Sequence, residues 1–270
     1  MHRTIFEVMS KSSKKRTSSK TTVGTLQTRI WLENLLRTHK ISRKDFTKKI
    51  GAENGDPTGI VLRWLKGLHT VKESRVENLA KIFEGSDAPY KLPLFKLLRN
   101  RPLTKADLFK IMSPYMRISW WIFPDPKQPE NMGLSFPPCL INDTDTLIER
   151  GDIYGFTAIL YLVRIAEAEK DAIAHFYYMG AAYSALPGLC RNQLFRKRWR
   201  EVLDCLQSIH CRVMTSMFIV KPIPSVIETQ IFSKYHITRR IFRPIDPETS
   251  RLIELQKPFE IADFHQPTRQ

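Results

Sequence analysis

The alternation of apolar and polar positions predicts four short helices between residues 25 and 86. The first, residues 29–37, carries apolar residues at helical spacing. Ser42, followed three residues later by Asp45, is a typical N-cap for a second helix that ends at Gly51. A tight, glycine-containing turn then leads to the third helix. Four short helices in about 60 residues are typical of a helix-turn-helix domain.

The third helix is predicted to start at Pro57 and to stop at Gly67. Its inner side is predicted to consist of Ile60, Val61, Trp64, Leu65 and Leu68. Its outward positions are then Thr58, Gly59, Leu62, Arg63 and Lys66. A fourth helix opens at Glu73 or Ser74 and ends at Gly85, and its predicted inward residues are Val76, Leu79, Ala80, Ile82 and Phe83.

Helical patterns dominate the rest of the chain as well. Thr104 and Asp107 can cap a short amphipathic helix that runs to about Met112. Residues 143–185 read as strongly helical, with a break near residues 169–171 or at Pro187, and residues 192–217 form another long helical pattern. The stretch 114–139 mixes prolines and aromatic residues and is predicted to be irregular. The expected fold is mainly α.

These patterns divide the chain into five parts. Residues 1–24 form a flexible basic arm, and residues 25–86 form the helix-turn-helix domain. Residues 87–103 contain three prolines and are predicted to be a linker. Residues 104–220 form a larger helical domain for dimerisation or effector binding. Residues 221–270 are a Pro-rich, irregular extension, mostly coil with room for one hairpin.

Charge indicates what the N-terminal part binds. The chain carries a net charge of +16, and residues 1–50 hold 13 basic and 3 acidic side chains, which is +10 of that total. Nucleic acid is the commonest polyanionic partner of such a segment. The cations of the arm, Lys14, Lys15 and Arg16, can reach a minor groove or a run of phosphates. The alternative for residues 1–22 is a solvated tail without a partner.

The segment 25–86 resembles a lambda-repressor-like (Xre-family) helix-turn-helix domain. The resemblance rests on Ile41-Ser42, Phe46 and Ile50-Gly51, on Val61-x-x-Trp64-x-x-Gly67, and on Leu79-Ala80-x-x-Phe83. The chain departs from the family pattern at Thr47, where a small Ala is usual, and in an interval from Gly51 to Val61 about four residues longer than typical. The resemblance implies duplex DNA as the partner and binding as a homodimer to two half-sites.

Groove recognition assigns roles to individual side chains. The outward residues of the third helix, Thr58, Gly59, Leu62, Arg63 and Lys66, are the candidates for base reading, and Arg63 suits a bidentate contact with guanine. The candidates for phosphate binding are Arg43, Lys44, Lys48, Lys49, His69 and Lys72. The alternative is a four-helix packing module with a solvated basic face.

A second cluster of cations lies in residues 191–200, interleaved with Phe195 and Trp199. Its members Arg191, Arg196, Lys197, Arg198 and Arg200 are a second candidate nucleic-acid surface. The equally weighted alternative is an exposed helix face whose two aromatic residues belong to the core. The sequence alone leaves both interpretations open.

Other chemistry finds little support in the sequence. The four cysteines have neither the Cys-x-x-Cys spacing of a zinc site nor the pattern of a disulfide framework. Motifs for nucleotide binding, serine hydrolysis and zinc proteolysis are missing, and His236-x-x-Arg239 lacks the downstream tyrosine of a tyrosine recombinase. We therefore expect no catalytic residues, metal or cofactor. The apolar runs are too short to cross a bilayer, and the sequence shows no secretory signal. We therefore expect a cytoplasmic, nucleoid-associated protein.

The function predicted from sequence is that of a sequence-specific, DNA-binding transcriptional regulator that is not an enzyme. Its C-terminal helical domain would dimerise or bind a protein partner. One alternative is a mobile-element or defence-system adaptor that binds nucleic acid and recruits a partner protein. A weaker alternative is a nucleic-acid-processing enzyme with an unrecognised fold. An operator footprint distinguishes the regulator from both.

Overall fold

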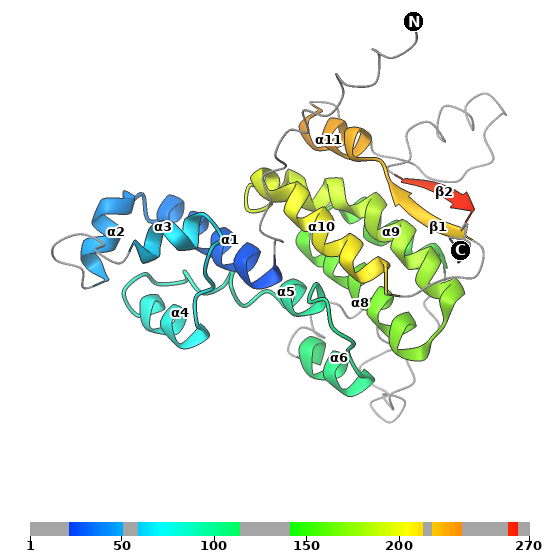
Figure 1. Ribbon diagram of the computed structural model, residues 1–270, viewed down its shortest axis with the longest axis horizontal. Coiled ribbons are helices and arrows are strands. Elements are labelled where there is room, and N and C mark those ends of the chain that lie inside the picture. Colours follow the sequence, from blue (N-terminus) through cyan, green and yellow to red (C-terminus); the bar gives the residue numbers. More distant parts are fainter. Residues whose placement is uncertain (1–21, 51–58, 114–140, 213–217, 234–258, 264–270) are drawn as a thin grey trace, which may run out of the picture.

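The computed structural model describes residues 22–50, 59–113, 141–212, 218–233 and 259–263. Helices make up most of these residues, so the expected mainly α fold is confirmed. Figure 1 shows a smaller group of helices, α1 to α4, beside a larger group that contains α8, α9 and α10. None of the helices in the described part of the chain combines the length and apolarity that a bilayer-spanning helix requires.

The smaller group contains four helices. Their bounds are Val23–Thr38 (α1), Arg43–Lys49 (α2), Ile60–Leu65 (α3) and Glu73–Ala80 (α4). Ser42 caps α2 as predicted, since its hydroxyl accepts a hydrogen bond from the amide of Asp45 at 3.1 Å. α1 starts earlier than expected, because Thr22 and Thr25 form a capping box. Residues 22–24, predicted to belong to the flexible arm, are instead the cap and first turn of α1, and the rest of the predicted arm lies outside the described residues.

The third helix begins at Ile60 rather than at Pro57. Gly59 precedes it with φ 61°, a left-handed conformation that cannot continue a right-handed helix. At the other end, Gly67 has φ 70°. The amide of Gly67 donates to the carbonyl of Trp64, and the amide of Leu68 donates to the carbonyl of Arg63. This pair of bonds is a Schellman motif, which explains why the helix stops where the sequence predicts.

The larger group is built on a helical hairpin. Its elements are Pro93–Leu97 (α5), Lys105–Met112 (α6), Ile141–Arg150 (α7), Ile153–Glu169 (α8), Ala172–Arg191 (α9), Arg196–Arg198 (η3) and Trp199–His210 (α10). α6 has the predicted Thr104–Asp107 capping box. The predicted break lies at Lys170, which has φ 60°, and not at Pro187, which α9 incorporates. Because α9 is largely buried, tertiary packing compensates for the amide that Pro187 lacks.

The C-terminal extension is more regular than its composition predicts. Phe218–Pro222 (β1) pairs antiparallel with Phe259–Asp263 (β2), so the two strands are far apart in sequence and do not form a hairpin. Pro224–Phe232 (α11) was expected to be coil. Pro224 occupies its first turn, and Ile227 and Ile231, one turn apart, are both buried on the larger group. β-branched residues are thus held in a helix by the face they bury.

Two hydrophobic cores share α1. Val23, Leu26 and Ile30 belong to the core of the larger group, whereas Trp31, Leu32 and Leu35 belong to the core of α2, α3 and α4. The predicted linker, residues 87–103, also contributes to the larger core, because Leu94, Phe95 and Leu97 of α5 belong to it. Two predicted inward residues, Leu68 and Ile82, are instead 54% and 56% exposed, since both follow the helix whose periodicity placed them inside.

Candidate nucleic-acid interface

The third helix has a buried side and an uncovered side. Val61 and Trp64 are buried, and the Trp64 ring packs edge-on against Trp31 of α1 with centroids 6.2 Å apart. On the other side, Leu62 is 37% exposed and Lys66 is exposed. Among the described residues, the C-terminal half leaves Leu62 and Lys66 exposed. α3 is therefore anchored from behind by Trp64, as the sequence predicts.

The remaining base-reading candidates have different surroundings. Gly59 is half-buried at the N-cap position, and its left-handed backbone starts the helix. Arg63 is half-buried, so it is less accessible than Lys66. Thr58 lies outside the described residues. The accessible polar side chain at the end of α3 is thus Lys66, next to the apolar Leu62.

All six predicted phosphate-binding residues are exposed. Four of them, Arg43, Lys44, Lys48 and Lys49, lie on α2, while His69 and Lys72 lie between α3 and α4. Lys49 rests over the Phe83 ring, 5.5 Å from its centroid, which orients its stem along the domain surface. The cations of α2 and those after α3 therefore precede and follow the third helix in sequence.

These cations also differ in electrostatic surroundings from those of the C-terminal half. Within the described residues, no carboxylate forms an ion pair with Arg43, Lys44, Lys48, Lys49, Lys66 or Lys72. In contrast, Lys105 pairs with Glu169 at 2.7 Å and Arg200 with Glu228 at 2.9 Å. Positive charge that no described carboxylate pairs with favours an anionic partner at α2 and α3.

The predicted second surface, residues 191–200, is largely engaged within the protein. Arg191 donates to the carbonyl of Gln230, Arg198 pairs with Glu33 of α1 and with Glu201, and Arg200 pairs with Glu228. Phe195 and Trp199 are core residues. Arg196, which lies 5.1 Å from the Phe232 ring centroid, and Lys197 remain exposed. This cluster mainly fastens α10 to α1 and α11.

Two arginines near α3 were missed by the sequence analysis. Arg75 of α4 donates to the carbonyl of Ile50, which ends α2, at 3.2 Å. It also lines an open groove of about 390 Å³ between α3 and α4, together with Trp64 and Lys72. Arg29 of α1 donates to the carbonyl of Leu65 at the end of α3. The helical spacing of Arg29, Glu33 and Arg37 was the available signal, but such a stripe is typical of a solvated face.

The described residues do not form a group of three His, Cys, Asp or Glu side chains that could hold a metal ion. Burial raises the pKa of the Cys205 thiol to about 12, and Cys190 shifts in the same direction. His210 is hydrogen-bonded to the hydroxyl of Tyr183, with Oη and Nδ1 3.0 Å apart. Cys190 and Cys205 thus pack as protonated thiols in the core of the larger group.

The geometry is that of a small helical domain with an uncovered third helix, exposed cations around it, and an ion-paired connection to a larger helical body. Comparisons of the chain with protein-family models, with curated proteins and with solved structures found no match.

Proposed function

We propose that the chain is a sequence-specific, DNA-binding transcriptional regulator. α3 enters the major groove with Leu62 and Lys66 toward the base edges, and Arg63 joins them once a duplex is bound. The cations of α2 and of the segment after α3 bind phosphates on either side. Leu62 suits contact with a thymine methyl group, and Lys66 suits the acceptors of guanine.

A single observation carries this proposal: the side of α3 that faces away from Trp64 is uncovered, and the exposed cations beside it have no carboxylate in ion-pair distance among the described residues. Had this side packed against the C-terminal half, groove entry would be impossible. The charge supplies affinity for any duplex, and the helix supplies the preference among sequences.

The larger helical group then serves regulation. We propose that it mediates homodimerisation, so that two copies of α3 read two half-sites, or that it binds a protein partner. α9 offers two exposed apolar side chains one turn apart, Ile173 and Tyr177, at 72% and 55% exposure. The cytoplasm, close to the chromosome, is the compartment that this function requires.

Selection of bound duplexes from a random pool at near-physiological salt tests the proposal. A regulator enriches a short motif, which is palindromic if the protein acts as a dimer. The variant Lys44→Ala/Lys48→Ala should weaken recovery of all duplexes, whereas Lys110→Ala, which removes an exposed lysine of α6, should not. Recovery without enrichment of any motif would contradict sequence-specific regulation.

A second candidate is the adaptor that binds nucleic acid and recruits a partner protein. The observation that favours it is the exposure of Leu68 and Ile82, two large apolar side chains on the smaller group. In that case the same selection yields bound duplexes without a common motif. Leu68→Ser would then leave the affinity for DNA unchanged and weaken binding of the partner.

A further inference from the structure

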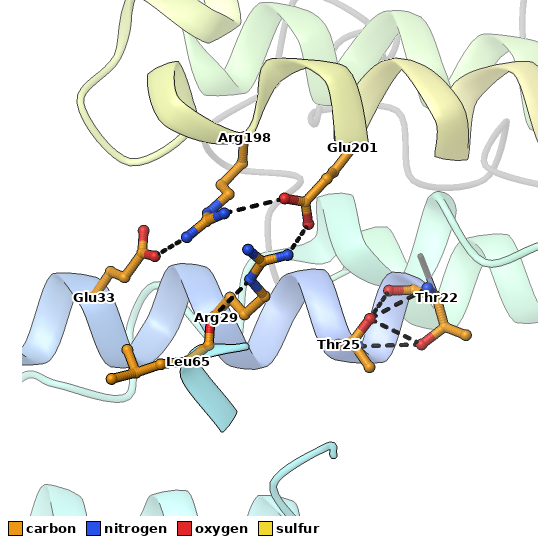
Figure 2. Close-up of polar contacts among 7 residues, drawn as sticks. All are labelled: Thr22, Thr25, Arg29, Glu33, Leu65, Arg198 and Glu201. Atoms are coloured by element: carbon orange, nitrogen blue, oxygen red, sulfur yellow. Dashed lines mark hydrogen bonds and ion pairs between the residues drawn. The ribbon is translucent and has the colours of Figure 1, made fainter. Parts of the chain in front are cut away.

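One face of α1 carries a polar stripe that contacts the segment leading into α10. Arg29, Glu33 and Arg37 follow each other at intervals of four residues, so they lie on the same side of the helix. Arg29 Nη1 lies 2.7 Å from Glu201 Oε2, Arg198 pairs with Glu33, and Arg37 Nη1 donates to Gln193 Oε1 at 2.8 Å. Figure 2 shows Arg29 and Glu33 reaching up from α1 toward Glu201 and Arg198.

This contact is a charge-balanced chain of ion pairs. Arg198 Nη1 also lies 3.2 Å from Glu201 Oε1, so two arginines and two glutamates are joined in series from Glu33 to Arg29. The four side chains are between 17% and 31% exposed. Partial burial makes the loss of one member costly for its partners, unlike the loss of a pair on the open surface.

Arg29 extends the network to the third helix. Its Nε donates to the carbonyl of Leu65, the last residue of α3, at 3.1 Å, while its Nη1 holds Glu201. Its stem lies against Gly67, since a Cβ built on Gly67 would be 2.8 Å from Arg29 Cδ. The planar guanidinium offers several donors in fixed directions, and one side chain thus binds the end of α3 and α10 together.

From this geometry we infer that Arg29 and Glu201 are positioning residues through which the C-terminal half sets the position of α3. The inference rests on the proposed function for its consequence in DNA binding. Glu201 holds the Arg29 guanidinium from α10, and Arg29 holds the last carbonyl of α3. A displacement of α10 therefore moves or releases the end of the helix that reads DNA. By reciprocity, a bound duplex also favours one position of α10.

Hydrogen exchange in the full chain tests the connection without DNA. Glu201→Gln removes the charge that holds Arg29, and the amides of Gly67 and Leu68, which close the end of α3, should exchange about tenfold faster. The matched control is Glu228→Gln, which breaks the ion pair between α11 and Arg200 of the same helix, α10, but has no link to α1. The control should leave these two amides unchanged.

Arg29→Lys provides the second arm and replaces Glu201→Gln if that variant does not fold. Lysine keeps the charge opposite Glu201 but has no planar fork with which to hold the carbonyl of Leu65 at the same time. The amides at the end of α3 should again exchange faster. Unchanged exchange at Gly67 and Leu68 in a folded variant would overturn the inference, whether or not the protein binds DNA.

DNA binding by the same variants measures the consequence. With a motif enriched by the wild-type chain, Glu201→Gln should lower the ratio of specific to non-specific affinity about tenfold and leave non-specific affinity unchanged, since no phosphate-binding cation is lost. A wild-type chain that enriches no motif contradicts the proposed function but leaves the exchange result standing. If Glu201→Gln kept the wild-type ratio of specific to non-specific affinity although the amides at the end of α3 exchanged faster, the role of the network in recognition would be overturned.

Discussion

At the scale of single residues, two exposed lysines of the smaller group are expected to act differently. Lys66 lies at the end of α3, and Lys44 lies in the first turn of α2. Under the proposed function Lys66 contacts base edges, so Lys66→Ala should cost about 1–3 kcal/mol on the preferred site and relax the base preference. Lys44→Ala should weaken binding to every sequence and reduce the salt dependence, because it removes a phosphate contact.

Titrations at several salt concentrations, on the selected duplex and on a scrambled one, measure both effects. An equal loss on the two duplexes for both variants would contradict the proposed orientation of α3. Lys110→Ala serves again as the control, since Lys110 lies on α6.

Two buried histidines predict how stability depends on pH. His175 and His210 are 1% and 7% exposed, and their rings lie 6.2 Å apart. Burial lowers the pKa of each to about 4, and in His175 the nearby His210 and Arg164 add to the effect. The folded pKa lies below the ordinary value of 6.5, so protons bind preferentially to the unfolded chain. Their contribution to stability is complete above about pH 6.5 and is lost as the pH falls toward 4.

The expected loss between pH 7 and pH 5 is about 1–2 kcal/mol for each histidine, measured as the free energy of unfolding in urea. The variant His175→Gln/His210→Gln should have a flatter pH profile even if it is less stable at pH 7. His69→Gln, which replaces an exposed histidine, should retain the wild-type slope. A wild-type chain equally stable at both pH values would contradict the prediction.

At the scale of elements, the ends of α3 and α4 offer a matched pair of glycines. Gly67 and Gly85 both have a left-handed backbone, with φ 70° and 71°. A Cβ on Gly85 would meet nothing within 4 Å, whereas one on Gly67 would collide with Arg29. Gly85→Ala should cost about 1 kcal/mol for the backbone alone. Gly67→Ala should cost about 2–4 kcal/mol, because the side chain of Arg29 must also move.

Denaturant unfolding of the two variants measures the difference, and that difference isolates the contact with Arg29. Equal destabilisation would mean that Arg29 moves aside at little cost, which would weaken its role in positioning α3. Gly67→Ala should also lose sequence preference in DNA binding, as expected for Arg29→Lys.

The ends of helices were the features best predicted from the sequence, and the tertiary contacts of helices were the least well predicted. The capping hydrogen bonds at Ser42, Thr104 and Gly67 join residues only three or four positions apart, so the local sequence is sufficient to predict them. α11 depends on Ile227 and Ile231 packing against α9, which no local pattern contains. The start of α3 depends on the backbone of Gly59, and a proline two residues earlier was the misleading signal.

The candidate site shows the same division. The exposed cations of α2 and the buried Trp64 follow from local periodicity, whereas the partners of Arg29 and Arg198 do not. Arg29 and Glu201 are 172 residues apart in the sequence. Each lies in a local pattern that is typical of a solvated helix face. Only the fold brings them together. The sequence therefore predicts where the chain is basic, but not which of its cations are engaged within the protein.

At the scale of the whole molecule, the two groups of helices should unfold as one unit. α1 contributes Leu26 to the larger core and Leu35 to the smaller one, and both side chains are fully buried. Unfolding of either core therefore releases part of the helix on which the other core packs. Cooperative units of this kind open with a common free energy in hydrogen exchange.

Leu26→Ala tests this coupling, because Leu26 belongs to the larger core alone. The cavity should cost about 2–5 kcal/mol. If the molecule is one cooperative unit, the amides of α4, whose buried residues Val76 and Leu79 belong to the smaller core, lose protection to the same extent as those of α9. If α4 keeps its wild-type protection while α9 loses it, the smaller group is stable without the larger one. In that case the two cores that share α1 would not form one cooperative unit.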